Sequence, residues 1–114
     1  MQKIQTLLEL LDARVFAGNM ERNLPQYAFG SDLMSDVLTL DSQDILLITG
    51  LSNPQTIRTA EMADINTIII ARGKQITNEM IEIAKESDIT LISSPYSLFK
   101  ICGILYNAGL KAIY

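Results

Sequence analysis

The chain has 114 residues, of which 48% are hydrophobic, and its formal net charge is −4. This length is enough for one core between a sheet and its helices, so we predict a single domain over residues 1–114. The nine Lys and Arg residues are scattered along the chain. Because nucleic acids and anionic membranes bind concentrated positive charge, we expect neither a nucleic acid nor a membrane as a partner.

The hydrophobic content also bears on assembly and location. A small domain this apolar favours burial of part of its surface between subunits, so we expect a homodimer. The apolar runs are far shorter than the ~20 residues that span a bilayer. Glu9 and Asp12 interrupt the N-terminal apolar pattern, and the lone Cys102 cannot form an internal disulfide. We therefore expect a cytoplasmic protein.

The first predicted element is a helix over residues 2–12. Ile4, Leu7, Leu8 and Leu11 are spaced so that they share one face of a helix. This face either covers the sheet or contributes to a dimer contact.

Two short strands and a short helix are predicted next. Residues 14–18 form an apolar strand closed by a glycine, and residues 27–30 form a second strand after a polar loop that contains a proline. Ser31 and Asp32 are good N-cap residues for a helix that follows. Asp32 and Asp36 lie one turn apart, so they either stabilise the positive end of this helix or supply two carboxylates to a metal.

The central part of the chain has the pattern of a β-α-β unit. Residues 45–49 and 67–71 are apolar runs without polar alternation, which suits strands covered on both faces of a parallel sheet. Between them, Asn53 fits an N-cap and Pro54 fits the first helical position. The pattern predicts an α/β fold, a mainly parallel sheet with right-handed βαβ crossovers and helices packed on it.

The C-terminal part continues this alternation. Thr77 is the expected cap of another helix, and residues 89–92 form a further buried strand. Residues 94–95 repeat the combination of a capping residue and a proline, which predicts a last helix over residues 96–107 that stops at Gly109.

Three features of the last helix and the tail need an explanation. Gly103 inside a helix costs about 1 kcal/mol relative to alanine, which predicts close packing of its backbone against a neighbour. Cys102 lies on the apolar face, where a thiol is buried and inert; a reactive thiol would need exposure and a positive neighbour. Residues 111–114 either add an edge strand or fray.

The segments ITGLSNPQTIRTAEM and IIIARGKQITNEMIEIAKESDITLISSPYSLF resemble the DRTGG-domain family. The resemblance lies in a strand ending in threonine-glycine, a strand ending in a glycine-containing turn, and a strand running into a proline-tyrosine turn. The literal signature is absent: Arg58 is the candidate for its arginine, and residues 72–73 stand where two glycines are expected.

The resemblance implies a fold similar to the N-terminal domain of HPr kinase/phosphorylase, which is not the catalytic part of that enzyme. DRTGG domains also occur beside CBS domains in pyrophosphatases and in some phosphotransacetylases, which implies a regulatory or assembly role. Small stand-alone versions are similar to proteins encoded near iron-only hydrogenase subunits, which implies a hydrogenase-related partner.

The residue inventory argues against catalysis. The chain has no histidine, which removes the commonest general base and most zinc sites. We therefore predict no catalytic residue, no metal, no cofactor and no enzyme activity.

Ligands of open α/β sheets bind at the carboxyl ends of the strands, where helix N-termini favour anions. Three loops are expected to converge there, at residues 49–53, 72–74 and 93–96. The candidate ligand-binding residues are Thr49, Gly50, Ser52, Asn53, Arg58, Arg72, Gly73, Lys74, Ser94 and Tyr96. The alternative is that the polar residues are ordinary helix caps and the cations are solvated.

Two functions remain open. The first is a non-catalytic regulatory or protein-interaction module that dimerises and responds to a small anionic ligand. The alternative is a sensor of an adenine nucleotide or phosphorylated metabolite that binds in the loops after the parallel strands. An enzyme that relies on carboxylate or lysine chemistry is the least supported reading, because the usual general base is missing.

Overall fold

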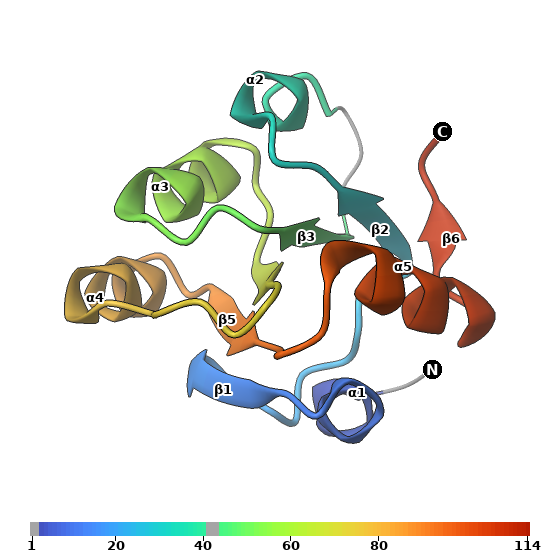
Figure 1. Cartoon of the computed structure of the whole chain (residues 1–114). Coiled ribbons are helices and arrows are strands. Elements are labelled where there is room, and N and C mark those ends of the chain that lie inside the picture. Colours follow the sequence, from blue (N-terminus) through green and yellow to red (C-terminus); the bar gives the residue numbers. More distant parts are fainter. Residues whose placement is uncertain (1–2, 41–43) are drawn as a thin grey trace.

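A computed structural model describes residues 3–40 and 44–114, which form a six-stranded sheet and five helices (Figure 1). The strands are β1 (Arg14–Ala17), β2 (Tyr27–Gly30), β3 (Ile45–Thr49), β4 (Thr67–Ile70), β5 (Thr90–Ser93) and β6 (Lys111–Ala112). The helices are α1 (Ile4–Leu11), α2 (Met34–Val37), α3 (Pro54–Met62), α4 (Asn78–Glu86) and α5 (Leu98–Asn107). The predicted α/β class is confirmed.

The strand order is β1-β5-β4-β3-β2-β6. Strand β1 is antiparallel to β5, and the other neighbouring pairs are parallel. Strands β3 and β4 lie side by side in the same direction, with Leu46 opposite Thr67. The β-α-β prediction for the central segments is therefore confirmed, and the carboxyl ends of the parallel strands share one edge of the sheet.

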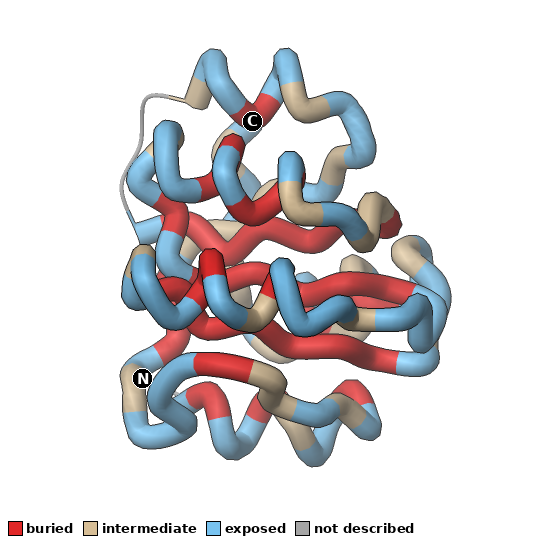
Figure 2. Tube along the Cα trace, turned by 90° about the vertical axis from the view of Figure 1, so that its left-hand side faces the viewer, coloured by how far each residue is buried: buried red, intermediate tan, exposed pale blue. Residues whose placement is uncertain are grey.

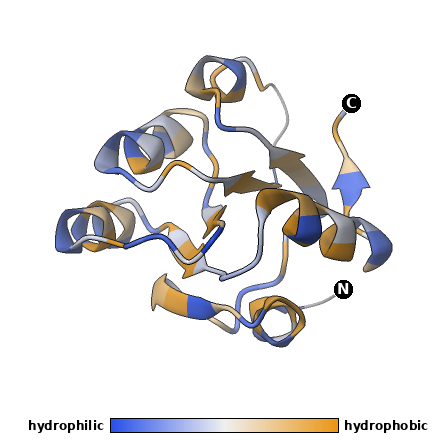
Figure 3. Ribbon diagram, in the orientation of Figure 1, coloured by the Kyte–Doolittle hydropathy of each residue, from blue (hydrophilic) through white to orange (hydrophobic). Residues whose placement is uncertain are grey.

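Helices cover both faces of the sheet, so the central strands are buried throughout (Figure 2). Helices α2, α3 and α4 pack on one face, where Ile57 contacts the cluster around Leu47 and Ile68. Helices α1 and α5 pack on the other face, around Ile48 and Ile69. Hydrophobic residues follow the central strands, while hydrophilic ones lie on the outward sides of α3 and α4 (Figure 3).

Helix α1 settles one alternative left by the sequence. Its residues Ile4, Leu7 and Leu11 are fully buried in the core on the second face, so this apolar side covers the sheet. The predicted range began at residue 2, which lies outside the described residues. In the described part of the chain, no helix combines the length and hydropathy needed to cross a bilayer.

Two of the four capping predictions are confirmed and two are wrong. Asn53 caps α3 and Thr77 caps α4. Helix α2 begins after Leu33, without any side-chain cap, so Ser31 and Asp32 do not cap it. Asp32 fails as a cap because its carboxylate bonds to the end of β3 instead, while the Ser31 hydroxyl bonds, among the described residues, only to Leu33.

The second wrong cap is at α5. The capping side chain is Ser97, whose hydroxyl accepts a hydrogen bond from the Lys100 amide at 3.2 Å. The helix starts at Leu98, two residues later than expected. Ser94 is fully buried and donates instead to the Leu11 carbonyl at 2.7 Å. Its proline neighbour therefore lies in the loop and not in the first helical turn.

The remaining expectations concern α5 and the tail. Gly103 is exposed, and beyond its chain neighbours and the backbone of its own helix no described atom lies within 4 Å of where its Cβ would be, so the predicted close packing inside the chain is wrong. Cys102 is half-buried rather than buried, and burial raises the pKa of its thiol. The tail adds an edge strand, because β6 pairs with β2, and Tyr114 lies edge-on against Phe29 with ring centroids 6.2 Å apart.

Candidate functional site

The loops after β3, β4 and β5 meet at the carboxyl edge of the sheet, as the sequence predicted. The Arg72 amide donates to the Tyr96 carbonyl at 2.8 Å, and the Gly73 amide donates to the Ser94 carbonyl at the same distance. These two bonds join the loop after β4 to the loop after β5. Side chains make the corresponding link between the loops after β3 and β4.

That second link involves Lys74 and Ser52. The Lys74 ammonium donates to the Gly50 carbonyl at 2.5 Å, and the Ser52 hydroxyl donates to the Gln75 carbonyl at 2.5 Å. Lys74 is the cation that the structure holds directly against the end of β3. Its position depends on β3 and β4 being parallel neighbours, since their ends then lie side by side.

Asp32 is the residue that the sequence reasoning did not include in the site. Its carboxylate oxygen Oδ1 accepts hydrogen bonds from the Thr49 hydroxyl at 2.9 Å and from the Gly50 amide at 2.5 Å. Asp32 follows β2, which is the other parallel neighbour of β3. A fourth loop therefore reaches the same edge. In the sequence, the sign of such a role was a polar residue, Asp32, soon after the strand at residues 27–30. Only the strand order shows that this strand lies beside β3.

Arg72 and Gly73 form the turn after β4 with positive φ values of 69° and 60°. Both residues are exposed. A Cβ on Gly73 would lie 3.6 Å from Pro95 Cα, so the turn runs close to the loop after β5. The left-handed conformation is costly for a residue with a Cβ, which makes Arg72 an unusual occupant of this position.

The other candidate residues divide into structural and peripheral ones. The Asn53 side chain is used as the α3 cap, because its Oδ1 accepts from the Thr56 amide at 2.9 Å. The Tyr96 ring is half-buried, and the Lys100 ammonium lies 3.8 Å from its centroid. Arg58 is exposed on α3 and makes none of the contacts that join these loops.

The groups at this edge are hydrogen-bond donors and a cation, and two of the donors already bind a carboxylate of the chain itself. The Thr49 hydroxyl and the Gly50 amide both donate to the Asp32 carboxylate, and Lys74 adds a full positive charge at the Gly50 carbonyl. Among residues 3–40 and 44–114, no group of three His, Cys, Asp or Glu side chains is placed to hold a metal ion. Asp32 and Asp36, considered above as two metal ligands, do not form such a group.

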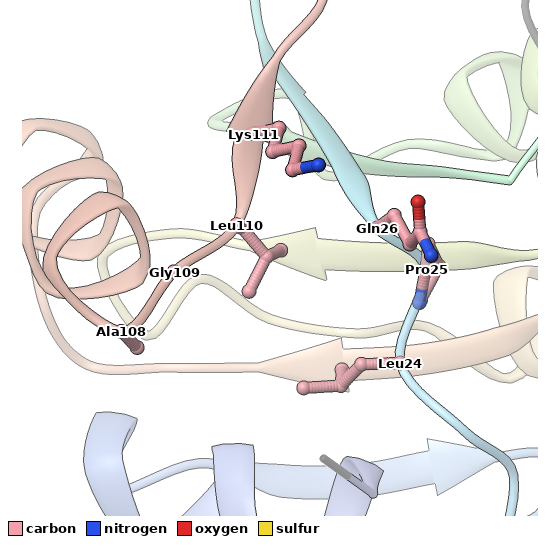
Figure 4. A pocket seen from close by; sticks show the side chains of 7 residues that line it. All are labelled: Leu24, Pro25, Gln26, Ala108, Gly109, Leu110 and Lys111. Carbon is pink, nitrogen blue, oxygen red and sulfur yellow. The ribbon is translucent and has the colours of Figure 1, made fainter. Parts of the chain in front are cut away.

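A separate pocket of about 430 Å³ lies at the opposite, amino edge of the sheet (Figure 4). It is lined by Leu24, Pro25, Gln26, Ala108, Gly109, Leu110 and Lys111. These residues precede β2 or lie just before and at the start of β6, so the pocket shares no residue with the loops described above. Lys111 is the charged residue of its lining, and the rest of the lining is uncharged.

The fold is that of a small α/β domain in which the loops after β2, β3, β4 and β5 gather at the carboxyl edge of the sheet. The DRTGG domain family matches residues 6–108, and the chain belongs to this family. No curated protein matches the chain.

A solved structure has the same fold. It is the crystal structure of the CBS and DRTGG domains of the regulatory region of Clostridium perfringens pyrophosphatase, complexed with the activator diadenosine tetraphosphate. The TM-score is 0.79 at 21% sequence identity, and the match covers 90% of this chain. The chain spans 45% of that structure's length.

Proposed function

We propose that this chain is a non-catalytic regulatory module that binds a small anionic ligand at the carboxyl edge of its sheet. Family membership supports the regulatory part, because the solved DRTGG domain of similar fold belongs to a regulatory region. The observation that carries the ligand part is the contact of Lys74 with the Gly50 carbonyl, which holds a cation against the residue whose amide, together with the Thr49 hydroxyl, binds a carboxylate.

The edge suits regulation because its loops are linked to one another. The β3 loop is bonded to Asp32 on one side and to Lys74 and Gln75 on the other. An anion that binds there changes contacts of several loops at once. A binding event is thereby passed to α2, α3 and α4, the helices that follow these loops.

The test is ligand-induced thermal stabilisation. Inorganic phosphate, AMP, ADP, ATP and diadenosine tetraphosphate are titrated at constant ionic strength, and the shift in melting temperature is followed. We expect at least one to stabilise the protein, and Lys74→Gln to reduce that shift more than Lys85→Gln does. Lys85 is an exposed lysine near the end of α4 and serves as a control with the same charge change. No shift with any of these compounds contradicts the proposal.

A second candidate is a sensor that requires an adenine nucleotide. The observation that favours it is the adenine-containing activator bound in the structure of similar fold. This reading predicts stabilisation by adenine nucleotides at concentrations where inorganic phosphate has no effect. If phosphate and nucleotide of equal charge raise the melting temperature equally, the result favours the first proposal, a site that recognises the anion and not the adenine.

The module is also proposed to be a cytoplasmic homodimer. Helix α5 supports dimerisation, because it exposes Phe99 by 89% and Tyr106 by 70%, on either side of the uncrowded Gly103. Sedimentation is expected to show a dimer that Phe99→Ser weakens. Leu33→Ser is the control, since Leu33 is 58% exposed in the segment before α2. A strict monomer at high concentration contradicts this part.

The regulated partner is proposed to be a protein associated with an iron-only hydrogenase, on the family resemblance alone. Direct binding between the two purified proteins, with and without the stabilising ligand, tests it. A ligand that leaves the affinity unchanged contradicts a regulatory link between site and partner.

A further inference from the structure

The Asp32 carboxylate is an anion that the protein already binds at the end of β3. One oxygen of the carboxylate accepts from both the Thr49 hydroxyl and the Gly50 amide, at 2.9 and 2.5 Å. The other oxygen, Oδ2, lies 3.2 Å from the position that a Cβ on Gly50 would take. The carboxyl group thus lies directly over Gly50, where a side chain would crowd it.

The donors in this contact are buried and would otherwise lack a partner. Thr49 is fully buried, and Gly50 is buried as well. The carboxylate comes from a different loop, between β2 and α2, and it caps no helix. Its role is therefore defined by the two donors at the end of β3 and not by local chain geometry.

We propose that Asp32 is an internal stand-in for the ligand, and that a phosphate group binds this edge by displacing the Asp32 carboxylate from Thr49 and Gly50. The inference rests on the proposed anion-binding function and adds how the site is kept closed. Phosphate oxygens accept from an amide and a hydroxyl in the same way as a carboxylate does. The site is occupied by the chain itself until a stronger anion arrives.

The competition selects the class of ligand. A free monocarboxylate has the same single charge as the Asp32 carboxylate that it would displace. It gains no extra attraction to offset the entropy lost on association, so it should not displace Asp32. A terminal phosphate ester carries more negative charge and more acceptor oxygens, and Lys74 already lies on the carbonyl side of Gly50. Phosphomonoesters and inorganic phosphate are therefore the ligands expected to displace Asp32, and simple carboxylates are not.

Displacement also has a structural consequence. Only Leu33 separates Asp32 from α2, a helix of four residues that has no side-chain cap. Val37 of α2 is buried against the core, while Leu33 and Leu38 are 58% and 49% exposed. Release of Asp32 therefore frees the start of a segment that displays apolar side chains, and it links the anion site to the surface around α2.

The experiment uses inorganic phosphate as the probe and the Gly50 amide as the reporter in NMR titrations at constant ionic strength. Asp32→Asn removes the competing charge at nearly constant size. Asp36→Asn, on the exposed part of α2, makes the same change in net charge without touching β3. We expect Asp32→Asn to lower the half-saturating phosphate concentration at least tenfold relative to wild type, and Asp36→Asn to leave it within twofold.

The outcomes separate the two proposals. If phosphate shifts Gly50 in the wild type, but Asp32→Asn binds no tighter than Asp36→Asn, the stand-in role is overturned and the anion site stands. If phosphate shifts Gly50 in neither wild type nor Asp32→Asn, the anion site itself is overturned. Should Asp32→Asn fail to fold, the wild type alone still tests the proposal. Phosphate is then expected to shift the NMR signal of the Asp32 carboxyl carbon, and an unchanged signal rules out displacement.

Discussion

The two edges of the parallel sheet are built by different means. At the amino edge, Asp44, Asp64, Asp88 and Gly109 all have positive φ, and each lies within a few residues of the start of a parallel strand. At the carboxyl edge, the side chains of Asp32, Ser52 and Lys74 link the loops after β2, β3 and β4, and the backbone amides of Arg72 and Gly73 link the loops after β4 and β5. The amino edge is thus set mainly by tight backbone turns, whereas the carboxyl edge combines one such turn, at Arg72 and Gly73, with side-chain contacts around the end of β3.

The comparison implies that the two edges have different roles, one in stability and the other in the response to anions. Tight left-handed turns offer little that a ligand can displace, so changes at the amino edge should alter stability alone. Side-chain contacts at the carboxyl edge can be exchanged for contacts to a ligand, so changes there should alter the response to anions. Four substitutions test this division, beginning with the largest expected effect.

Gly18→Ala should destabilise the fold by about 3 kcal/mol or more. Gly18 has a φ of 101°, and a Cβ there would lie 2.4 Å from Thr90 Oγ1 and 2.5 Å from Thr90 Cα at the start of β5. Neither the strain nor the overlap can be relieved by a side-chain rotation. Urea unfolding measures the loss. Gly103→Ala is the control, since its site is open and helical, and a gain of about 1 kcal/mol is expected.

Arg22→Ala should lower the free energy of unfolding by about 1 kcal/mol and leave the stabilisation by anions unchanged. The guanidinium joins two turns of the amino edge, donating to the Asp88 carboxylate at 3.1 Å and to the Asn66 carbonyl at 3.3 Å. Arg58→Ala, which removes an exposed arginine of α3, should stay within about 0.5 kcal/mol. Equal losses in both variants would deny Arg22 a bridging role.

Arg72→Gly is expected to separate stability from binding. Glycine tolerates the φ of 69° at this position, so the free energy of unfolding should rise by up to about 1 kcal/mol. The same change removes a cation from the carboxyl edge, so stabilisation by phosphate should fall. Thermal unfolding with and without phosphate measures both. A variant that gains stability and keeps its full response to phosphate would place Arg72 outside the site.

Asp64→Asn should raise the free energy of unfolding by about 0.5 kcal/mol. Asp64 lies in the left-handed turn just after the C-terminus of α3, where asparagine is well tolerated and a negative charge is opposed by the helix dipole. Asp88→Asn is the matched control after α4, because it weakens the pair with Arg22 and should give no gain. Equal gains at both positions would mean that the Arg22 pair contributes nothing.

Sequence patterns were sufficient where the relevant contacts are local. The Asn53 and Thr77 caps bond to amides three residues away, and the apolar runs of β3 and β4 need only cover on two faces to be recognised as buried strands. The meeting of three loops at one edge followed from parallel strands alone, without knowledge of any side-chain position.

The carboxyl site itself was decided by tertiary structure. Asp32 and Ser94 looked like local caps, but Asp32 bonds to the end of β3 and Ser94 to the end of α1, 83 positions away along the chain. The strand order put β2 beside β3, and packing left Gly103 open. The physical reason is that a polar side chain bonds to whichever unpaired buried group lies nearest in space, and that neighbour is chosen by the assembled sheet rather than by spacing along the chain.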